Sequence, residues 1–282
     1  MKFDTIINSI ESLPPLNDAI LKIKKLYENS KEDIDIPQLV ELIESDALLA
    51  ANILRVANSP VYGFSRKISS ISQAVTLFGI MQVYALIISH AIEENIRANT
   101  EVYGVTNERF NNICHVQSAL IIKWYSKINI EDAQLLSPIA LIMESGKLIV
   151  TDEVSKSSYI DEFKSGLHHA KSIESYEKEV LGTTSYNLSA ILFNHWNLNS
   201  MYTKVLESLD SEKSLNRDMQ RYVDILKVVR TAVNMRELLT KHSVIKATEL
   251  LREFGLEVEP FVEVAIEIKK SYIGHKQEAK EY

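Results

Sequence analysis

The stretch 44–80 combines a strong helical repeat with a fixed interruption. After an N-cap at Ser45-Asp46, apolar residues recur in the steps of three and four that form one face of a helix: Leu49, Ala50, Ile53, Leu54 and Ala57. The alanines leave room for close neighbours, so the helix, predicted over 46–58, is an interior one. Asn58-Ser59-Pro60 ends it, because proline cannot continue the hydrogen-bond ladder and disfavours a helical residue before it.

A second helix follows a short loop in which Gly63 provides the flexible point. Ser70 and Gln73 have the spacing of a capping box, and this helix is predicted over 71–97. Gly79 falls inside it, where glycine costs about 1 kcal/mol relative to alanine. We therefore expect a close backbone contact at Gly79.

The rest of the chain carries the same helical pattern. Helices are predicted to start near Leu16, Asp35 and Asn107, and to cover 132–143, 172–181, 184–196, 200–208, 216–239, 245–254 and 260–273. We expect Gly146 to end the buried 132–143 helix and 163–169 to form a polar break. No segment alternates like a strand for long enough to build a sheet, so the sequence predicts an all-α fold.

Composition narrows the classes of function. The 282 residues can bury a large core in one or two domains, and the net charge of −7 argues against the basic stripe that nucleic-acid binding needs. The single cysteine, Cys114, excludes internal disulfides and suits a reducing cytoplasm. Residues 1–12 lack the apolar core of a secretion signal, and the longest apolar runs fall short of the roughly 20 residues that span a bilayer. We expect a soluble, cytoplasmic protein with no nucleic-acid or membrane partner.

Short motifs with regular spacing run through the first part of the chain: Leu13-Pro14-Pro15-Leu16, Ile43-Glu44-Ser45-Asp46, Leu54-Arg55-Val56-Ala57-Asn58-Ser59, Tyr62-Gly63, Ile68-Ser69-Ser70-Ile71, Ala74 and Leu77-Phe78-Gly79. Their order resembles the HDOD family, bacterial signalling domains related to the HD metal-dependent phosphohydrolases. The resemblance implies a multi-helix HD-like bundle with an N-terminal and a C-terminal helical lobe. The expected divisions are an N-terminal segment (1–12), an HDOD domain (13–208) with lobes at about 13–98 and 107–208, and a C-terminal helical extension (209–282) packing on the HD-like lobe.

HD enzymes bind a metal that generates a nucleophilic water. The resemblance implies which positions of this chain correspond to the ligands of that metal. Aligned on Gly146-Lys147, this chain has Met143 and Glu144 in place of the histidine-aspartate pair. A thioether is a poor ligand for hard divalent metals, so this change removes most of the site. His115, 28 residues before Met143, lies where the first histidine falls.

Two more ligand positions are changed. Ser185 takes the place of a further histidine, and Val233 or Asn234 that of the final aspartate. One histidine cannot hold a catalytic metal, so we expect no metal, no cofactor and no catalytic residue. His115 is then interpreted as a core or interface histidine bonded to a backbone carbonyl.

Other side chains that could carry chemistry have simpler interpretations. His168 and His169 are adjacent on the chain and point about 100° apart on a helix, which does not favour a shared metal. Cys114 does not face His115 for the same reason, and core packing is expected there. Lys147 is interpreted as a cation at a helix C-terminus, because no glycine-rich loop surrounds it.

The leading interpretation is a non-catalytic HDOD regulatory protein that binds a protein partner in a signalling pathway, or a small nucleotide. The alternative is a divergent metal-dependent phosphohydrolase acting on a nucleotide or cyclic dinucleotide, and a third class is direct DNA binding. Ligands are expected in the groove between the lobes. The candidate contact surface is the loop with exposed Asn58, Tyr62, Phe64, Arg66 and Lys67; otherwise this loop is a structural corner in which Asn58 caps a helix.

Overall fold

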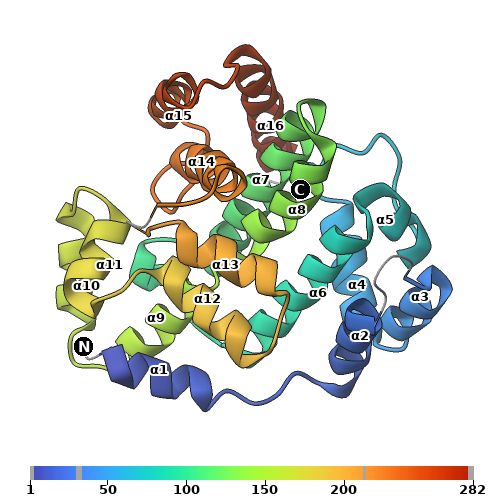
Figure 1. Ribbon diagram of the computed structural model, residues 1–282, viewed down its shortest axis with the longest axis horizontal. Helices are drawn as coiled ribbons and strands as arrows, with labels where there is room; N and C mark the ends of the chain where they lie inside the picture. Colours follow the sequence, from blue (N-terminus) through green and yellow to red (C-terminus); the bar gives the residue numbers. More distant parts are fainter. Residues whose placement is uncertain (1–2, 30–33, 212–213, 279–282) are drawn as a thin grey trace.

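The computed structural model describes residues 3–29, 34–211 and 214–278, so the extreme ends of the predicted N-terminal segment and C-terminal extension lie outside it. These residues form an all-α structure, as predicted, with an isolated β-bridge between Val233 and Leu238 and no strand (Figure 1). The helices are α1 (Phe3–Glu11), α2 (Asp18–Asn29), α3 (Ile36–Glu44), α4 (Ala47–Ala57), α5 (Ile71–Phe78), α6 (Ile80–Asn95), η1 (Thr100–Tyr103), α7 (Asn107–Trp124), η2 (Tyr125–Lys127), α8 (Ile130–Ile142), α9 (Gly146–Ser155), α10 (Ile160–His169), α11 (Ile173–Leu181), α12 (Ser185–His195), α13 (Ser200–Ser208), α14 (Arg217–Ala232), α15 (Lys241–Glu253) and α16 (Glu259–Glu278).

Side-chain caps set where α4 and α5 begin. Asp46 Oδ1 accepts hydrogen bonds from the backbone N–H groups of Leu48 and Leu49, each at 3.0 Å. Ser70 Oγ accepts one from the Gln73 N–H at 3.2 Å. Both caps stand where the sequence predicts them, and Ser70 also marks the end of the loop that joins α4 to α5.

The helix predicted over 71–97 is two helices. α5 ends at Phe78 and α6 begins at Ile80, and the two are bent by 117°. Gly79 forms the corner with φ of 79°, a conformation that glycine adopts without the steric cost of a Cβ atom. A Cβ added there would meet no atom within 4 Å. The expected close contact is therefore wrong, and the positive φ explains the glycine.

The helices divide into two lobes that share α6. Helices α2–α5 form the N-terminal lobe and α7–α13 the C-terminal lobe, while α6 packs on α4 and α5 and also on α8 (Figure 1). Helices α14–α16 extend the C-terminal lobe, with α16 against α7. α1 packs on α9 and α12, so the chain starts on the C-terminal lobe and then crosses to α2.

The end of α12 binds the chain segment that leads from α1 to α2. Trp196 Nε1 donates a hydrogen bond to the Pro14 carbonyl at 3.1 Å, and His195 Nε2 lies 3.3 Å from the Leu13 carbonyl oxygen. Two motifs far apart in the sequence, Leu13-Pro14 and His195-Trp196, are thus joined in space.

Helices α8 and α9 run through the middle of the C-terminal lobe. Gly146 begins α9, so the predicted helix end there is wrong. A Cβ on Gly146 would lie 1.8 Å from the Ser185 carbonyl oxygen, which shows how closely α9 approaches α12. The continuous stretch Ile130–Ser155 is long and apolar enough to cross a membrane, but 89% of its most apolar window is buried inside the protein, as in a core helix.

Two further helix predictions differ from the structure. The polar break predicted at 163–169 belongs to α10, which buries Phe163 and Leu167 one turn apart. The helix predicted over 216–239 ends at Ala232, and the chain then turns because Asn234 Oδ1 accepts hydrogen bonds from the N–H groups of Arg236 and Glu237, each at 3.0 Å.

Candidate functional site

The centre of the C-terminal lobe holds a buried ion pair. Glu144 lies in the turn between α8 and α9, Lys147 lies in the first turn of α9, and each is only 1% exposed. The Lys147 ammonium nitrogen is 2.6 Å from Glu144 Oε2. Buried charges require such pairing, because removal from water costs several kcal/mol per ion. Lys147 is therefore an interior cation at a helix start, and the predicted place at a helix C-terminus is wrong.

Polar groups from distant segments close around this pair. Gln117 of α7 donates from Nε2 to Glu144 Oε1 at 2.8 Å and to the Val233 carbonyl at 2.9 Å. The Tyr186 hydroxyl donates to the same carboxylate oxygen at 3.3 Å. The ammonium donates to Ser185 Oγ at 2.8 Å and lies 4.6 Å from the centre of the Tyr186 ring.

A second buried carboxylate lies behind Ser185. Glu177 is fully buried and accepts hydrogen bonds from the Tyr103 hydroxyl at 2.6 Å and from the Ser185 N–H at 2.7 Å. Burial raises the pKa of Glu177, and the nearby Lys147 charge and these two hydrogen bonds oppose that rise. One ammonium thus serves two carboxylates, Glu144 directly and Glu177 at longer range.

The electrostatics keep the charge of Lys147 fixed. Burial alone would lower its pKa, but the Glu144 carboxylate, with Tyr186 and Glu177, raises the pKa of Lys147 well above its ordinary value. Burial and Glu144 together raise the pKa of Tyr186, which therefore stays neutral. The cluster is an internal structural element in which Lys147 stays charged.

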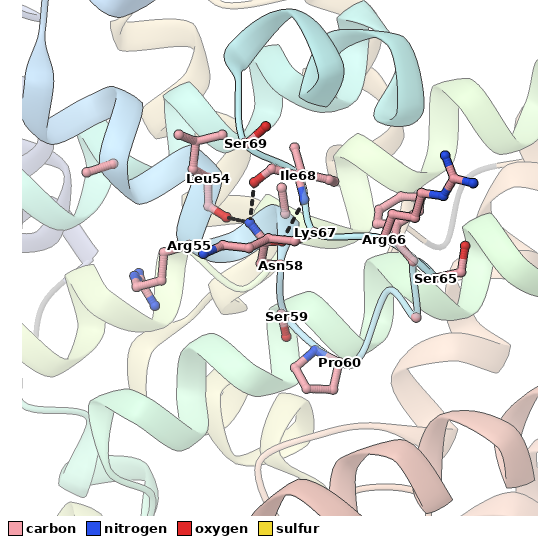
Figure 2. A pocket seen from close by; sticks show the side chains of 14 residues that line it. Leu54, Arg55, Asn58, Ser59, Pro60, Ser65, Arg66, Lys67, Ile68 and Ser69 are labelled. Carbon is pink, nitrogen blue, oxygen red and sulfur yellow. Dashed lines mark hydrogen bonds between the residues drawn. The ribbon is translucent and has the colours of Figure 1, made fainter.

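An open groove of about 820 Å³ lies at the α4–α5 connection of the N-terminal lobe. Its charged lining residues are Arg55, Arg66 and Lys67. Figure 2 shows Arg55 and Arg66 on opposite sides of Asn58, with Lys67 between them. We refer to this hollow, lined by residues 51–69, as the basic groove.

Asn58 holds the two ends of this loop together. Its Nδ2 donates to the carbonyls of Leu54 at 2.7 Å and Ile68 at 2.8 Å, and its Oδ1 accepts from the Ile68 N–H at 2.8 Å (Figure 2). The alternative of a structural corner capped by Asn58 thus describes part of the loop. Arg66 and Lys67 are nevertheless exposed beside it.

The two aromatic residues of the loop turn inward. Tyr62 is 5% exposed, because its ring packs edge-on against Phe78 with 4.7 Å between the ring centres. Its hydroxyl lies 3.3 Å from His115 Nδ1. Phe64 is partly buried against the same Phe78 ring. The expectation that Tyr62 is exposed is therefore wrong, and the accessible part of the predicted surface is Asn58, Arg66 and Lys67, with part of Phe64.

The HDOD domain family matches residues 13–211. The chain belongs to the HDOD family. Among solved structures, it is similar to a candidate phosphohydrolase of Shewanella amazonensis SB2B, with 16% identity, 94% of this chain and 97% of that chain covered, and a TM-score of 0.68. It is also similar to a candidate signal-transduction protein of Marinobacter aquaeolei VT8, with 18% identity, 93% and 59% covered, and a TM-score of 0.66.

A curated relative matches a smaller part of this HDOD protein. An uncharacterised protein of Treponema pallidum (strain Nichols) is 29% identical over 85 residues, which are 30% of this chain and 16% of that protein. The chain therefore spans a small part of the length of this relative. The family match shows an HDOD domain, and these two structural neighbours show that the protein shares their fold.

The structure brings together three of the five degenerate positions of this HDOD protein. Glu144 is the carboxylate of the ion pair, the Ser185 hydroxyl accepts from its ammonium, and the Val233 carbonyl accepts from Gln117 beside it. Met143 is fully buried, and its carbonyl accepts a hydrogen bond from Ser189 Oγ at 2.9 Å. His115 makes no hydrogen bond with Glu144 and faces Tyr62 of the other lobe instead.

His115 has the chemistry of a neutral histidine. Burial, with a smaller contribution from the Arg55 charge, lowers its pKa to about 4. Its hydrogen-bond partner is the Tyr62 side chain, where a backbone carbonyl was expected. His115 thus contacts the N-terminal lobe through Tyr62 of the loop between α4 and α5.

The residues around Glu144 do not fit the divalent metal of HD phosphohydrolases. The Lys147 ammonium stands 2.6 Å from Glu144 Oε2, where a metal bound to that oxygen would lie, and two cations at this distance repel. Of the other close groups, Gln117 presents an amide N–H to the carboxylate and Ser185 a hydroxyl to the ammonium. Within the described ranges, no group of three or more His, Cys, Asp or Glu side chains could hold a metal ion.

Sequence reasoning missed three members of the cluster, namely Gln117, Glu177 and Tyr186. Of the residues around Glu144, Lys147 alone had a local signal in the sequence, since it follows Glu144 by three residues, a spacing that lets opposite charges meet on a helix. The others come from α7, α11 and α12, and their approach depends on tertiary packing.

Proposed function

We propose that this HDOD protein is a non-catalytic bacterial regulatory protein that acts in the cytoplasm by binding a protein partner or a small ligand. The observation that carries the proposal is the ammonium of Lys147 beside Glu144. In an HD enzyme this region must hold a metal that lowers the pKa of a water molecule. Here a side-chain cation neutralises the carboxylate from within, and such a cation cannot deliver a metal-bound hydroxide.

The burial of the cluster also supports this proposal. Glu144, Lys147, Gln117 and Ser185 are each at most 1% exposed, so a phosphate ester has no access to them. Catalytic acids and bases must come within hydrogen-bond reach of the reacting groups. The surfaces that remain accessible on the HDOD domain serve binding.

Metal analysis and hydrolase assays test the proposal together. Protein purified without chelator would be analysed for iron, manganese and zinc, and then assayed with bis-p-nitrophenyl phosphate after addition of each metal. We expect far less than stoichiometric metal and no turnover above the metal-only blank. Stoichiometric metal or turnover in the wild type, lost in Glu144→Gln, would establish the divergent phosphohydrolase instead.

A further inference from the structure

The basic groove is a concentrated positive region in a protein of net charge −7. Its lining contains Arg55, Arg66 and Lys67 and no aspartate or glutamate. Arg66 and Lys67 are exposed, and neither forms an ion pair with a residue that the structure describes. Like charges held close together on a loop repel, and an anionic ligand relieves that repulsion.

The Arg55 guanidinium interacts with other groups of the protein. Its guanidinium donates a hydrogen bond to the Asn52 side chain, and its charge opposes the rise that burial causes in the pKa of Glu93. Arg55 therefore adds positive charge to the lining of the groove but is already engaged by these groups. Arg66 and Lys67 are the cations that are free to contact a ligand.

The groove is pre-organised by hydrogen bonds within its frame. Asn58 ties Leu54 to Ile68, and the Ser69 N–H donates to Gln73 Oε1 at 2.9 Å. A rigid loop loses less conformational entropy when a ligand binds. Ser59 and Ser65 also line the groove, and serine hydroxyls can donate hydrogen bonds to phosphate oxygens.

The lining also has an apolar part, contributed by Leu54, Ala57, Phe64 and Ile68. The volume of about 820 Å³ lies within the range of small-molecule sites, roughly 300–1,000 Å³. A ligand that matches this groove carries negative charge for the cations and a flat or apolar portion for this wall. Arginine and lysine side chains together with hydroxyls are typical phosphate-binding groups.

We propose that the basic groove binds a phosphorylated small molecule of nucleotide size. Its phosphates contact Arg66 and Lys67, and its apolar portion packs on Phe64 and Leu54. This inference deepens the proposed function by naming a ligand class and a site for the binding role. It does not depend on the Glu144–Lys147 cluster.

Isothermal titration calorimetry of the full chain tests the site, with inorganic pyrophosphate and ADP as probes. The Arg66→Ala/Lys67→Ala variant is compared with Lys241→Ala/Arg252→Ala, which removes the same charge from exposed positions on α15. Loss of charge-assisted hydrogen bonds is expected to weaken binding of both probes roughly tenfold or more in the groove variant. The α15 variant is expected to bind like the wild type. Circular dichroism verifies that both variants are folded.

Three results would overturn the inference: no heat from either probe at millimolar concentration, equal affinity in the groove variant and the wild type, or binding of a glutamate-rich peptide in the absence of pyrophosphate binding. The last result would assign the groove to an acidic segment of a partner protein. Failure of the proposed function looks different, because it appears as metal-dependent hydrolysis that requires Glu144 and is unaffected by Arg66→Ala/Lys67→Ala.

Discussion

Replacing Lys147 by methionine measures how strongly the interior ion pair stabilises the fold. The change keeps most of the side-chain volume but leaves the Glu144 carboxylate, 1% exposed, without its counterion. Breaking a buried pair costs about 3–5 kcal/mol. Gln117 and Tyr186 still donate to Glu144 Oε1, at 2.8 and 3.3 Å, so we expect a loss near the lower bound, about 3 kcal/mol.

Removing the other charge of the pair should cost more stability. Glu144→Gln leaves the ammonium buried with Ser185 Oγ as its close acceptor, and we expect a loss of about 4–5 kcal/mol. The double variant Lys147→Met/Glu144→Gln removes both charges, so its loss should be smaller than the sum of the two by about 2 kcal/mol or more.

Urea unfolding followed by far-UV circular dichroism gives these free energies, provided the dependence on urea concentration is equal among variants. Lys156→Met is the matched control, because Lys156 pairs with Asp152 and Glu153 at the surface and its side chain is 63% exposed. Its loss should stay below about 1 kcal/mol. A Lys147→Met loss as small as that of the control, or strictly additive losses in the double variant, would refute the view that the pair is a coupled interior element.

Three other outcomes are expected. The pKa of His115 falls from 6.5 to about 4 on folding, so its contribution to stability is complete above pH 6.5 and is lost as pH falls toward 4. In urea titrations at a series of pH values, His115→Gln should reduce the stability lost on acidification by up to about 3 kcal/mol, and an unchanged pH profile would contradict this. Gly146→Ala should lower the melting temperature sharply or prevent folding, since its Cβ would lie 1.8 Å from the Ser185 carbonyl oxygen. Gly104→Ala is the control: its Cβ meets no atom within 4 Å, so the protein should lose only about 1–2 kcal/mol of stability from the positive φ. Equal losses in the two variants would show that α9 and α12 can separate. Asn58→Ala removes three hydrogen bonds, and should destabilise the protein by about 1–3 kcal/mol and weaken pyrophosphate binding, while full retention of binding would show that the loop frame does not shape the groove.

Features that depend on a few neighbouring residues were predictable from the sequence. Asp46 and Ser70 cap helices where the local pattern places them, because a cap needs only the side chain and the next N–H groups. The corner at Gly79 was not, since glycine can mark either a close contact or a positive φ. Only the three-dimensional path of α5 and α6 distinguishes the two.

The candidate site depends on distant contacts, and here sequence reasoning was less complete. Glu144 and Lys147 look like a solvated pair of charges until α7 and α12 cover them. His115 has the right spacing for an HD ligand, yet Gln117 is the α7 residue that reaches Glu144. Two positions along a helix turn the side chain by about 200°, so a small alignment offset exchanges one face for the other.

The bonds from Trp196 to Pro14 and from His195 to Leu13 have a consequence for motion. The chain passes between the lobes once after α1 and again through α6, and the first passage is fastened at its C-terminal-lobe end by these two contacts. The polypeptide therefore closes a circuit through both halves of the molecule. Only residues 15–17 then remain between the Pro14 contact and the start of α2, so this second connection limits how far the lobes can open about α6.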